Sequence, residues 1–254
     1  SVLCGQFREG DSDEVAAGYA RILEHVDPTV LPQFGAENLL HRMAYKVYAA
    51  SATSMRSGTV PFVVPAGEDA LEGAEDRLND SQDAYLNVAL LKDAVRPILE
   101  KSGPSPVPDV VQLFGSDGRV RDVRIMVDRA VLSEWLRGQL SEAAVEIKEA
   151  IVRGFEQVTR AEAPYGSLRV LLGGRLSMNT TLQERLAAVL PQGVRIHRFR
   201  EPDDTNLAAP TVKLATALGI LALRFQPMAP AAVSDDRATF KYRVGRNKRG
   251  KLLT

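Results

Sequence analysis

The sequence predicts an α/β fold, and three observations support this class. A run of apolar residues, 170–172, stops abruptly at Gly173-Gly174, and a helical pattern begins a few residues later. Residues 110–127 have the alternation of a β-hairpin around an Asp-Gly turn, and a long helical pattern follows over residues 129–160. Hydrophobic residues make up 45% of the chain and charged residues 25%, as in ordinary globular domains.

Composition also limits the partners and the compartment. The 254 residues suffice for one large or two small domains. Thirty-two basic residues balance 32 acidic ones, so no overall field attracts nucleic acid or a membrane. A single cysteine, Cys4, excludes an internal disulfide, and no apolar run approaches the roughly 20 residues that cross a bilayer. We therefore expect a cytoplasmic protein, and the missing initial methionine suggests a processed chain or a piece of a longer one.

The N-terminal region predicts two helices. Asp11 stands three residues before Glu14, the spacing of a capping box, and indicates a helix that ends at Asp27-Pro28. Its apolar positions at helical spacing are Val15, Tyr19, Ile22, Leu23 and Val26. A second helix is predicted after Gly35, with an apolar face made of Leu39, Leu40, Met43, Val47 and Tyr48.

The composition of the chain changes after residue 50. In order, we expect a loop at 51–58, a proline-bounded edge strand at 60–65, a partly helical acidic stretch at 67–80, a helix at 81–101, a linker at 102–108 and the hairpin. The candidate core positions of the helix are Tyr85, Val88, Leu91, Val95 and Leu99.

The rest of the chain alternates helices and strands. Asp128 is placed to cap the long helix, and Asn179 to cap a helix over 180–190. The remaining expected elements are a strand at 167–172, a strand at 194–197, a small-residue helix at 211–223, and a basic tail with a strand at 240–244 and a turn at 246–250.

The candidate binding residues are few. Gly173 and Gly174 leave a backbone that a ligand can approach closely, although such a turn also serves simply to pack a helix on a strand. Arg175 could stack on a base or contact a phosphate, or it could be an ordinary exposed arginine. Asp93 and Arg96 form either base contacts or an i,i+3 helix pair. The three histidines, His25, His41 and His197, have no partners at metal-ligand spacing, so no metal site is predicted.

Four stretches, in order, resemble the second lobe of the nucleotide-binding domain of DnaK-type heat-shock chaperones, members of the actin-like ATPase superfamily. Residues 34–42 are similar to the family's Gly-Gly-x-x-Phe-Asp segment, and residues 110–136 to its hairpin and following helix. Residues 170–179 resemble its Val-Gly-Gly-Ser-x-Arg-x-Pro adenosine turn, and residues 215–219 its closing Ala-Val-Ala-x-Gly helix. The resemblance covers about residues 30–225.

The resemblance implies an actin-like ATPase (ribonuclease H-like) lobe with an inserted α+β subdomain. The lobe core would comprise residues 1–50 and 128–228, the insert 51–127, and a basic β tail or linker to a following domain 229–254. The implied ligand is ATP or ADP, with Mg in the intact protein. The backbone of Gly173 and Gly174 would lie against its ribose and α-phosphate, Arg175 would stack on the base or contact a phosphate, and Asp93 and Arg96 would contact the base.

The sequence also departs from the family. The Ser-x-Arg after the glycines is replaced by Arg175-Leu-Ser-Met, and the family's Asp-x-Gly-Gly-Gly-Thr phosphate loop and first lobe are absent from this chain. No catalytic residue is therefore predicted here, and a protein partner or client would be engaged through regions outside it. Two alternatives stay open. One is a pseudo-ATPase module that keeps the fold for protein contact, and the other is an actin-like ATPase of the sugar-kinase or filament type.

Overall fold

The computed structural model describes residues 1–100, 107–160, 163–199, 228–232, 246–248 and 251–253. Its helices are α1 (Ser12–Ala16), α2 (Ala36–Ala50), α3 (Ala52–Ser57), α4 (Gln82–Glu100), α5 (Arg129–Thr159) and α6 (Thr180–Val189), with short 3-10 turns η1 (Pro32–Phe34), η2 (Tyr165–Ser167) and η3 (Arg175–Met178). Its strands are β1 (Gly5–Glu9), β2 (Arg21–His25), β3 (Val110–Phe114), β4 (Val120–Arg124), β5 (Arg169–Leu172), β6 (Arg195–Arg198), β7 (Met228–Ala232), β8 (Arg246–Lys248) and β9 (Lys251–Leu253).

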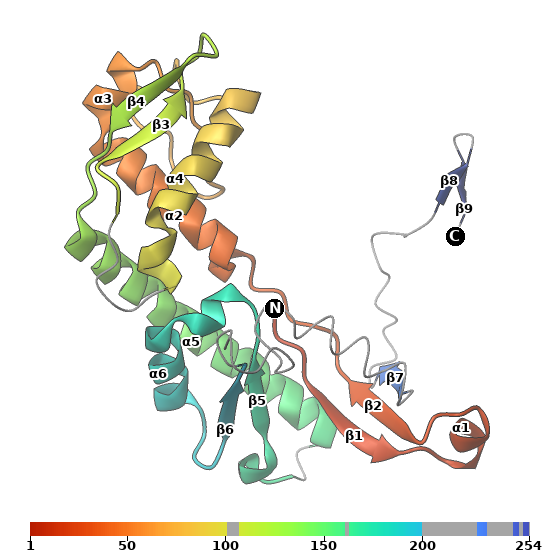
Figure 1. Ribbon diagram of the computed structural model, residues 1–254. Coiled ribbons are helices and arrows are strands. Elements are labelled where there is room, and N and C mark those ends of the chain that lie inside the picture. Colours follow the sequence, from red (N-terminus) through yellow and green to blue (C-terminus); the bar gives the residue numbers. More distant parts are fainter. Residues whose placement is uncertain (101–106, 161–162, 200–227, 233–245, 249–250, 254) are drawn as a thin grey trace, which may run out of the picture.

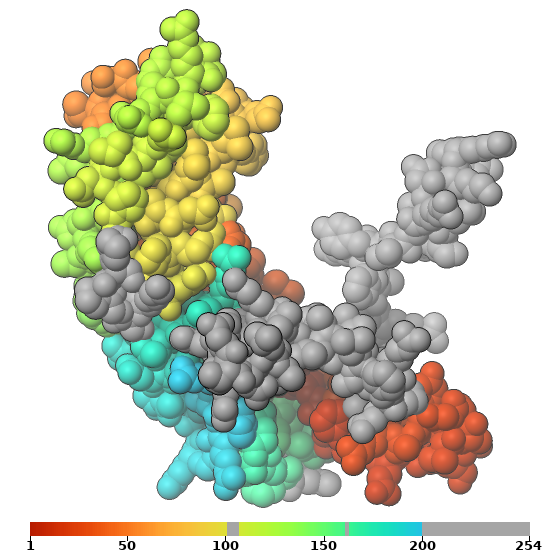
Figure 2. All heavy atoms as spheres, in the orientation of Figure 1, coloured from red at the N-terminus to blue at the C-terminus, as the bar shows by residue number. Residues whose placement is uncertain are grey.

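The fold is mixed α/β, as predicted, and its described sheets are small. β1 pairs antiparallel with β2, and β2 pairs in parallel with β7. β3 and β4 form the predicted hairpin, β5 and β6 form a parallel pair, and β8 and β9 form a terminal hairpin. Figures 1 and 2 show α3 and the β3–β4 hairpin at one end of the molecule and the β1–β2 pair at the other. None of the described helices combines the length and apolar character needed to cross a bilayer.

The predicted N-terminal helix is correct at its start and wrong at its end. Asp11 and Glu14 form the capping box, in which the Asp11 side chain accepts from the Glu14 N–H at 2.9 Å and Glu14 accepts from the Asp11 N–H at 2.9 Å. The helix α1 ends at Ala16, because Gly18 follows with a φ of +93°. Of the predicted apolar positions after it, Ile22 and Leu23 belong to strand β2, in which Ile22 is buried.

The main hydrophobic core lies between α2, α4, α5 and the β3–β4 hairpin. It contains the predicted face of α2, with Leu39, Leu40 and Met43 fully buried, and the predicted positions Leu91 and Leu99 of α4. Apolar residues of α6 extend it toward the β5–β6 pair. Four predictions in this part are wrong. Tyr85, predicted in the core, is 57% exposed, and residues 52–57, predicted as a loop, form a helix. The predicted edge strand at 60–65 makes only an isolated bridge, at Phe62, and residues 67–80, predicted as partly helical, form turns without a helix.

The core continues across residue 50, where the sequence suggests the start of an inserted subdomain. The Tyr48 hydroxyl, at the end of α2, donates to the Val60 carbonyl at 2.9 Å. Ser51 Oγ accepts from the Met126 N–H at 2.8 Å, after the hairpin. The α2 helix thus belongs to the same packed unit as residues 51–127.

The caps and strands of the second half follow the prediction closely. The Asp128 side chain caps α5, and Asn179 caps α6 by accepting from the Leu182 N–H at 3.3 Å. β5 and β6 occupy the predicted strands within one or two residues. Residues 246–248, predicted as part of a turn, form strand β8. The predicted helix at 211–223, the strand at 240–244 and the loop before them lie outside the described residues.

One buried amide joins three segments of the core and yields a stability prediction. Asn87, on α4, is fully buried; its Nδ2 donates to the carbonyls of Pro61 and Phe114, and its Oδ1 accepts from the Phe114 N–H, at 2.8–2.9 Å. Asn87→Ala leaves these backbone groups unpaired, so we expect the free energy of unfolding to fall by about 3 kcal/mol in urea titrations. Gln112→Ala, on the exposed face of the hairpin, should change it by less than about 0.5 kcal/mol. Equal effects of the two variants would contradict this role.

Candidate functional site

The double-glycine turn lies where β5 ends. Gly174 has a φ of +80°, a conformation that only glycine adopts without strain. Its carbonyl accepts from the Ser177 N–H at 3.1 Å and from the Ser177 hydroxyl at 2.7 Å, which fixes the turn into η3. Among the described residues, a Cβ added at Gly174 would meet nothing within 4 Å, and one at Gly173 would meet only the Phe199 ring, at 3.9 Å. The backbone of this turn is therefore open to a ligand.

The predicted pair on α4 is present in the structure. Asp93 Oδ1 accepts from Arg96 Nε at 3.1 Å and from Arg96 Nη2 at 2.9 Å. Arg96 also contacts two further carboxylates: Glu37, at the start of α2, at 3.4 Å, and Glu100, one turn further along α4, at 3.7 Å. The pair is thus an i,i+3 helix pair, which the sequence allowed as the alternative to base contacts. It also belongs to a larger group of ion pairs.

Glu100 connects this group to the glycine turn. Its Oε1 lies 3.7 Å from Nη1 of Arg175, the residue that follows the two glycines. The structure therefore brings all five sequence-predicted residues into one neighbourhood, although about 80 positions separate Arg96 from Arg175. We call the six side chains joined by these ion pairs the charged cluster: Glu37, Lys92, Asp93, Arg96, Glu100 and Arg175.

Three members of the charged cluster were not selected from the sequence. Glu100 stands at i+4 from Arg96, a spacing that alone would have suggested it. Glu37 and Lys92 form an ion pair between α2 and α4, and only the packing of these two helices reveals it. The hydrogen bond from Lys92 lowers the pKa of Glu37, so that carboxylate is ionised at neutral pH. Burial opposes the charge of Arg96, but its bonds to Asp93 and Glu37 outweigh this and raise its pKa.

The positive and negative charges of the charged cluster are equal in number, and this balance affects which ligands it can bind. Three carboxylates face one lysine and two arginines, so the formal charges cancel. Such a surface offers hydrogen bonds to a neutral polar ligand without a net attraction for phosphate. Each carboxylate is already paired with a cation, so these groups do not form a free set of oxygen ligands for Mg²⁺. The described residues near the turn thus fit a base or a sugar better than a metal.

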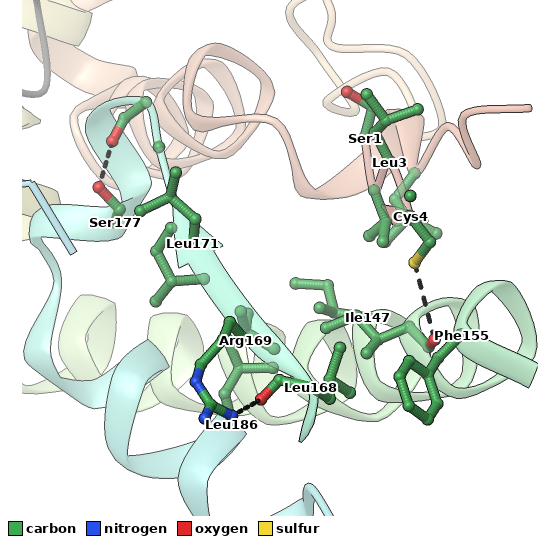
Figure 3. A pocket seen from close by; sticks show the side chains of 18 of the residues that line it. Ser1, Leu3, Cys4, Ile147, Phe155, Leu168, Arg169, Leu171, Ser177 and Leu186 are labelled. Carbon is green, nitrogen blue, oxygen red and sulfur yellow. Dashed lines mark hydrogen bonds between the residues drawn. The ribbon is translucent and has the colours of Figure 1, made fainter. Parts of the chain in front are cut away.

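A pocket of about 890 Å³ opens beside the glycine turn. Its walls are the Ser1–Phe7 segment on one side and β5 on the other, with the second half of α5 beneath them (Figure 3). Gly173, Gly174 and Arg175 lie at one end of it. Most of its lining is apolar, and the described lining includes Arg175 but not Asp93 or Arg96.

Cys4 is the one thiol in the pocket lining, and it is not a reactive group. Burial raises the pKa of the thiol, so it stays protonated at neutral pH. Its Sγ lies 3.7 Å from the Ile151 carbonyl, as a weak donor. Two of the histidines have backbone partners: His41 Nε2 contacts the Val63 carbonyl at 2.8 Å and His25 Nδ1 the Val26 carbonyl at 3.2 Å. Within the described residues, no three His, Cys, Asp or Glu side chains gather as a metal site would require.

No family model, curated protein or solved structure matches this chain. The site is therefore judged on its own geometry, and the DnaK-type resemblance remains a prediction.

The lowered pKa of Glu37 gives a pH test of the charged cluster. A depressed carboxyl pKa contributes stability above the unfolded value, about 4.3, and this contribution is lost as the pH falls through the folded value. Glu37 is 56% exposed, so we expect Glu37→Gln to cost only roughly 0.5 kcal/mol at pH 7, by urea unfolding, and less at pH 3. Lys92→Met added to Glu37→Gln should cost less than the sum of the single changes. A difference that is unchanged at pH 3 would contradict the ion pair.

Proposed function

We propose that this chain is the second lobe of a DnaK-like ATP-binding chaperone and that it contributes the adenosine side of the nucleotide site. One observation carries the proposal. Residues selected for adenosine contact from two distant parts of the sequence, Asp93 and Arg96 on α4 and Gly173 to Arg175 after β5, lie in one neighbourhood joined through Glu100.

The chemistry of the neighbourhood supports a nucleoside. The open backbone at Gly173 and Gly174 permits the flat side of a ribose or base to lie against it. The Arg175 side chain is 45% exposed and can stack on an adenine ring. Asp93, 69% exposed, offers carboxylate oxygens to an amino or hydroxyl donor.

The balanced charge restricts what this chain does by itself. Phosphate groups would gain little from a cluster with no net charge, and the resemblance places the phosphate loops and the catalytic lysine outside these residues. The intact protein would bind ATP between two lobes, with Mg²⁺ held on the phosphates, and the angle between the lobes would report the nucleotide to a partner. This chain alone is proposed to bind without hydrolysing.

The first test compares ligands. Adenosine, ADP and ATP should bind this chain with dissociation constants within about threefold of one another in calorimetric titrations, because the cluster contacts the nucleoside and not the phosphates. Guanosine serves as the matched control and should bind more weakly. No heat from any adenine ligand, with a folded chain by circular dichroism, would contradict nucleoside binding.

The second test removes the exposed arginine. Arg175→Ala should weaken adenosine binding by roughly three- to tenfold, the range expected for a lost cation–π contact. Arg137→Ala is the matched control, because Arg137 is half exposed on α5 and pairs with Glu134. Equal affinities for Arg175→Ala and the unchanged protein would show that the ligand does not contact Arg175.

The pseudo-ATPase module is the second candidate, and a specific observation favours it. Arg96 is 21% exposed and already satisfied by three carboxylates, so its guanidinium has little free capacity for a ligand. A cluster that serves only to hold α2, α4 and the glycine turn together would need no nucleotide. Failure of the adenine titrations with an intact fold would select this candidate; a sugar kinase or filament-type ATPase would instead retain nucleotide binding.

A further inference from the structure

The β5–β6 pair has one face toward the core and one face away from it. On the core side, Val170 is 7% exposed, and Leu172 and Ile196 pack against the main hydrophobic core. Successive side chains of a strand point to opposite faces, so the odd-numbered residues of both strands lie on the other side. We call these four exposed side chains the basic face: Arg169, Leu171, Arg195 and His197.

Two arginines stand side by side at the start of the basic face. Arg169 and Arg195 are register partners on adjacent strands, which run about 4.8 Å apart. Arg169 Nη1 donates to the carbonyls of Gly166 at 2.7 Å and Leu168 at 3.1 Å, and these bonds hold its guanidinium in place. Like charges directly opposite each other destabilise a sheet, so this pair requires an explanation.

The charge of these two arginines is not neutralised within the part of the chain that the structure describes. Elsewhere, Arg42 and Arg121 pair with carboxylates at 2.6 Å and 2.7 Å, whereas neither arginine of the basic face forms an ion pair with a described residue. The sequence is also locally basic, since residues 163–199 hold five arginines and one glutamate. The basic face is therefore a positive patch on a protein whose total formal charge is zero.

An aromatic ring continues the basic face toward the glycine turn. Phe199 follows β6, two positions after His197, and is partly exposed. Its Cε2 lies 3.9 Å from the place that a Cβ at Gly173 would take, so the ring lies beside the bare backbone of the turn. Leu171, 63% exposed, follows Arg169 along β5 toward this turn (Figure 3). The surface thus has a cationic end and an aromatic end.

The two ends suit two different parts of one ligand. A pair of guanidinium groups binds a phosphate by charge-assisted hydrogen bonds. A partly exposed aromatic ring binds the flat side of a base by stacking, and only an unpaired, unstacked base offers that side. Cations for the backbone together with a ring for a base are the combination that binds single strands, whereas a duplex keeps its bases stacked inside.

We infer that the basic face binds single-stranded nucleic acid, with a backbone phosphate between Arg169 and Arg195 and a base on the Phe199 ring. Arg195 and Phe199 are four residues apart, about 13 Å along an extended chain, so the phosphate and the base belong to different nucleotides of the strand. This inference does not depend on nucleoside binding at the charged cluster, because none of the cluster's side chains belongs to the basic face.

The experiment measures the fluorescence anisotropy of labelled oligothymidylate and oligouridylate, each of about 12 nucleotides, with the full chain. At about 50 mM NaCl we expect dissociation constants between about 1 and 100 µM, the range of sequence-independent binding. The logarithm of the association constant should fall with the logarithm of the salt concentration with a slope of about −1.4, because two arginines each replace a counterion.

A double substitution tests the arginines. Arg169→Gln with Arg195→Gln should weaken binding at least about tenfold and bring the salt slope close to zero. The matched control is Arg246→Gln with Lys248→Gln, which removes the same charge from β8 in the basic tail and should change the affinity less than about twofold. Arg195→Gln alone relieves the repulsion, so its melting temperature should rise by roughly 1–2 °C.

A second substitution tests the ring. Phe199→Ala should weaken binding of both oligonucleotides by about fivefold or more, because a stacked base is lost, and should leave the salt slope unchanged. Phe7→Ala is the matched control, since Phe7 is 67% exposed on β1 and lies outside the basic face; it should have no effect.

Each other outcome overturns the inference. Loss of binding in the β8 variant but not in the Arg169 and Arg195 variant would assign the nucleic acid to the basic tail. Equal affinity for a duplex of the same length, or unchanged binding by Phe199→Ala, would exclude the base contact. Competition by polyglutamate as effective as that by unlabelled oligothymidylate would assign the basic face to an acidic polypeptide. No binding by a chain that is folded by circular dichroism would refute the inference, whatever the result of the adenosine titrations.

Discussion

The candidate site depends on one buried side chain, Asn179. It is 3% exposed; its Nδ2 donates to the Leu99 carbonyl near the end of α4 at 2.7 Å, and its Oδ1 caps α6. Because of these two bonds, the turn after β5 is held against the last turn of α4. In this arrangement Glu100 and Arg175 lie 3.7 Å apart. A polar group buried this deeply is costly unless all its bonds are made, so it specifies one docking geometry.

The charged cluster and the pocket share Arg175 but have different chemistry. The cluster is polar and balanced in charge, whereas the pocket is mainly apolar and is flanked by open strand edges. We propose that a base or a sugar binds the first.

Local signals predicted most elements, and their failures have a common cause. The capping residues Asp11, Asp128 and Asn179 identified the starts of three helices, because a cap is a local hydrogen bond. The helix predicted to reach Asp27 failed because Ile22 and Val26 fit helical spacing and strand pairing equally well. Long-range pairing with β1 decided between these alternatives, and no local window contains that information.

The sequence by itself determined the mixed α/β class, the hairpin, the long helix, and the bare turn at Gly173 and Gly174, since these follow from periodicity, capping and the conformational freedom of glycine. It also singled out Asp93 and Arg96, but not what they contact. Only the tertiary structure decided that α4 and the glycine turn are neighbours and that Glu37 neutralises the cluster, because such contacts arise from helix packing between residues distant in the chain. The gap between β1 and β5 is likewise a property of how two sheets are placed, not of either strand alone.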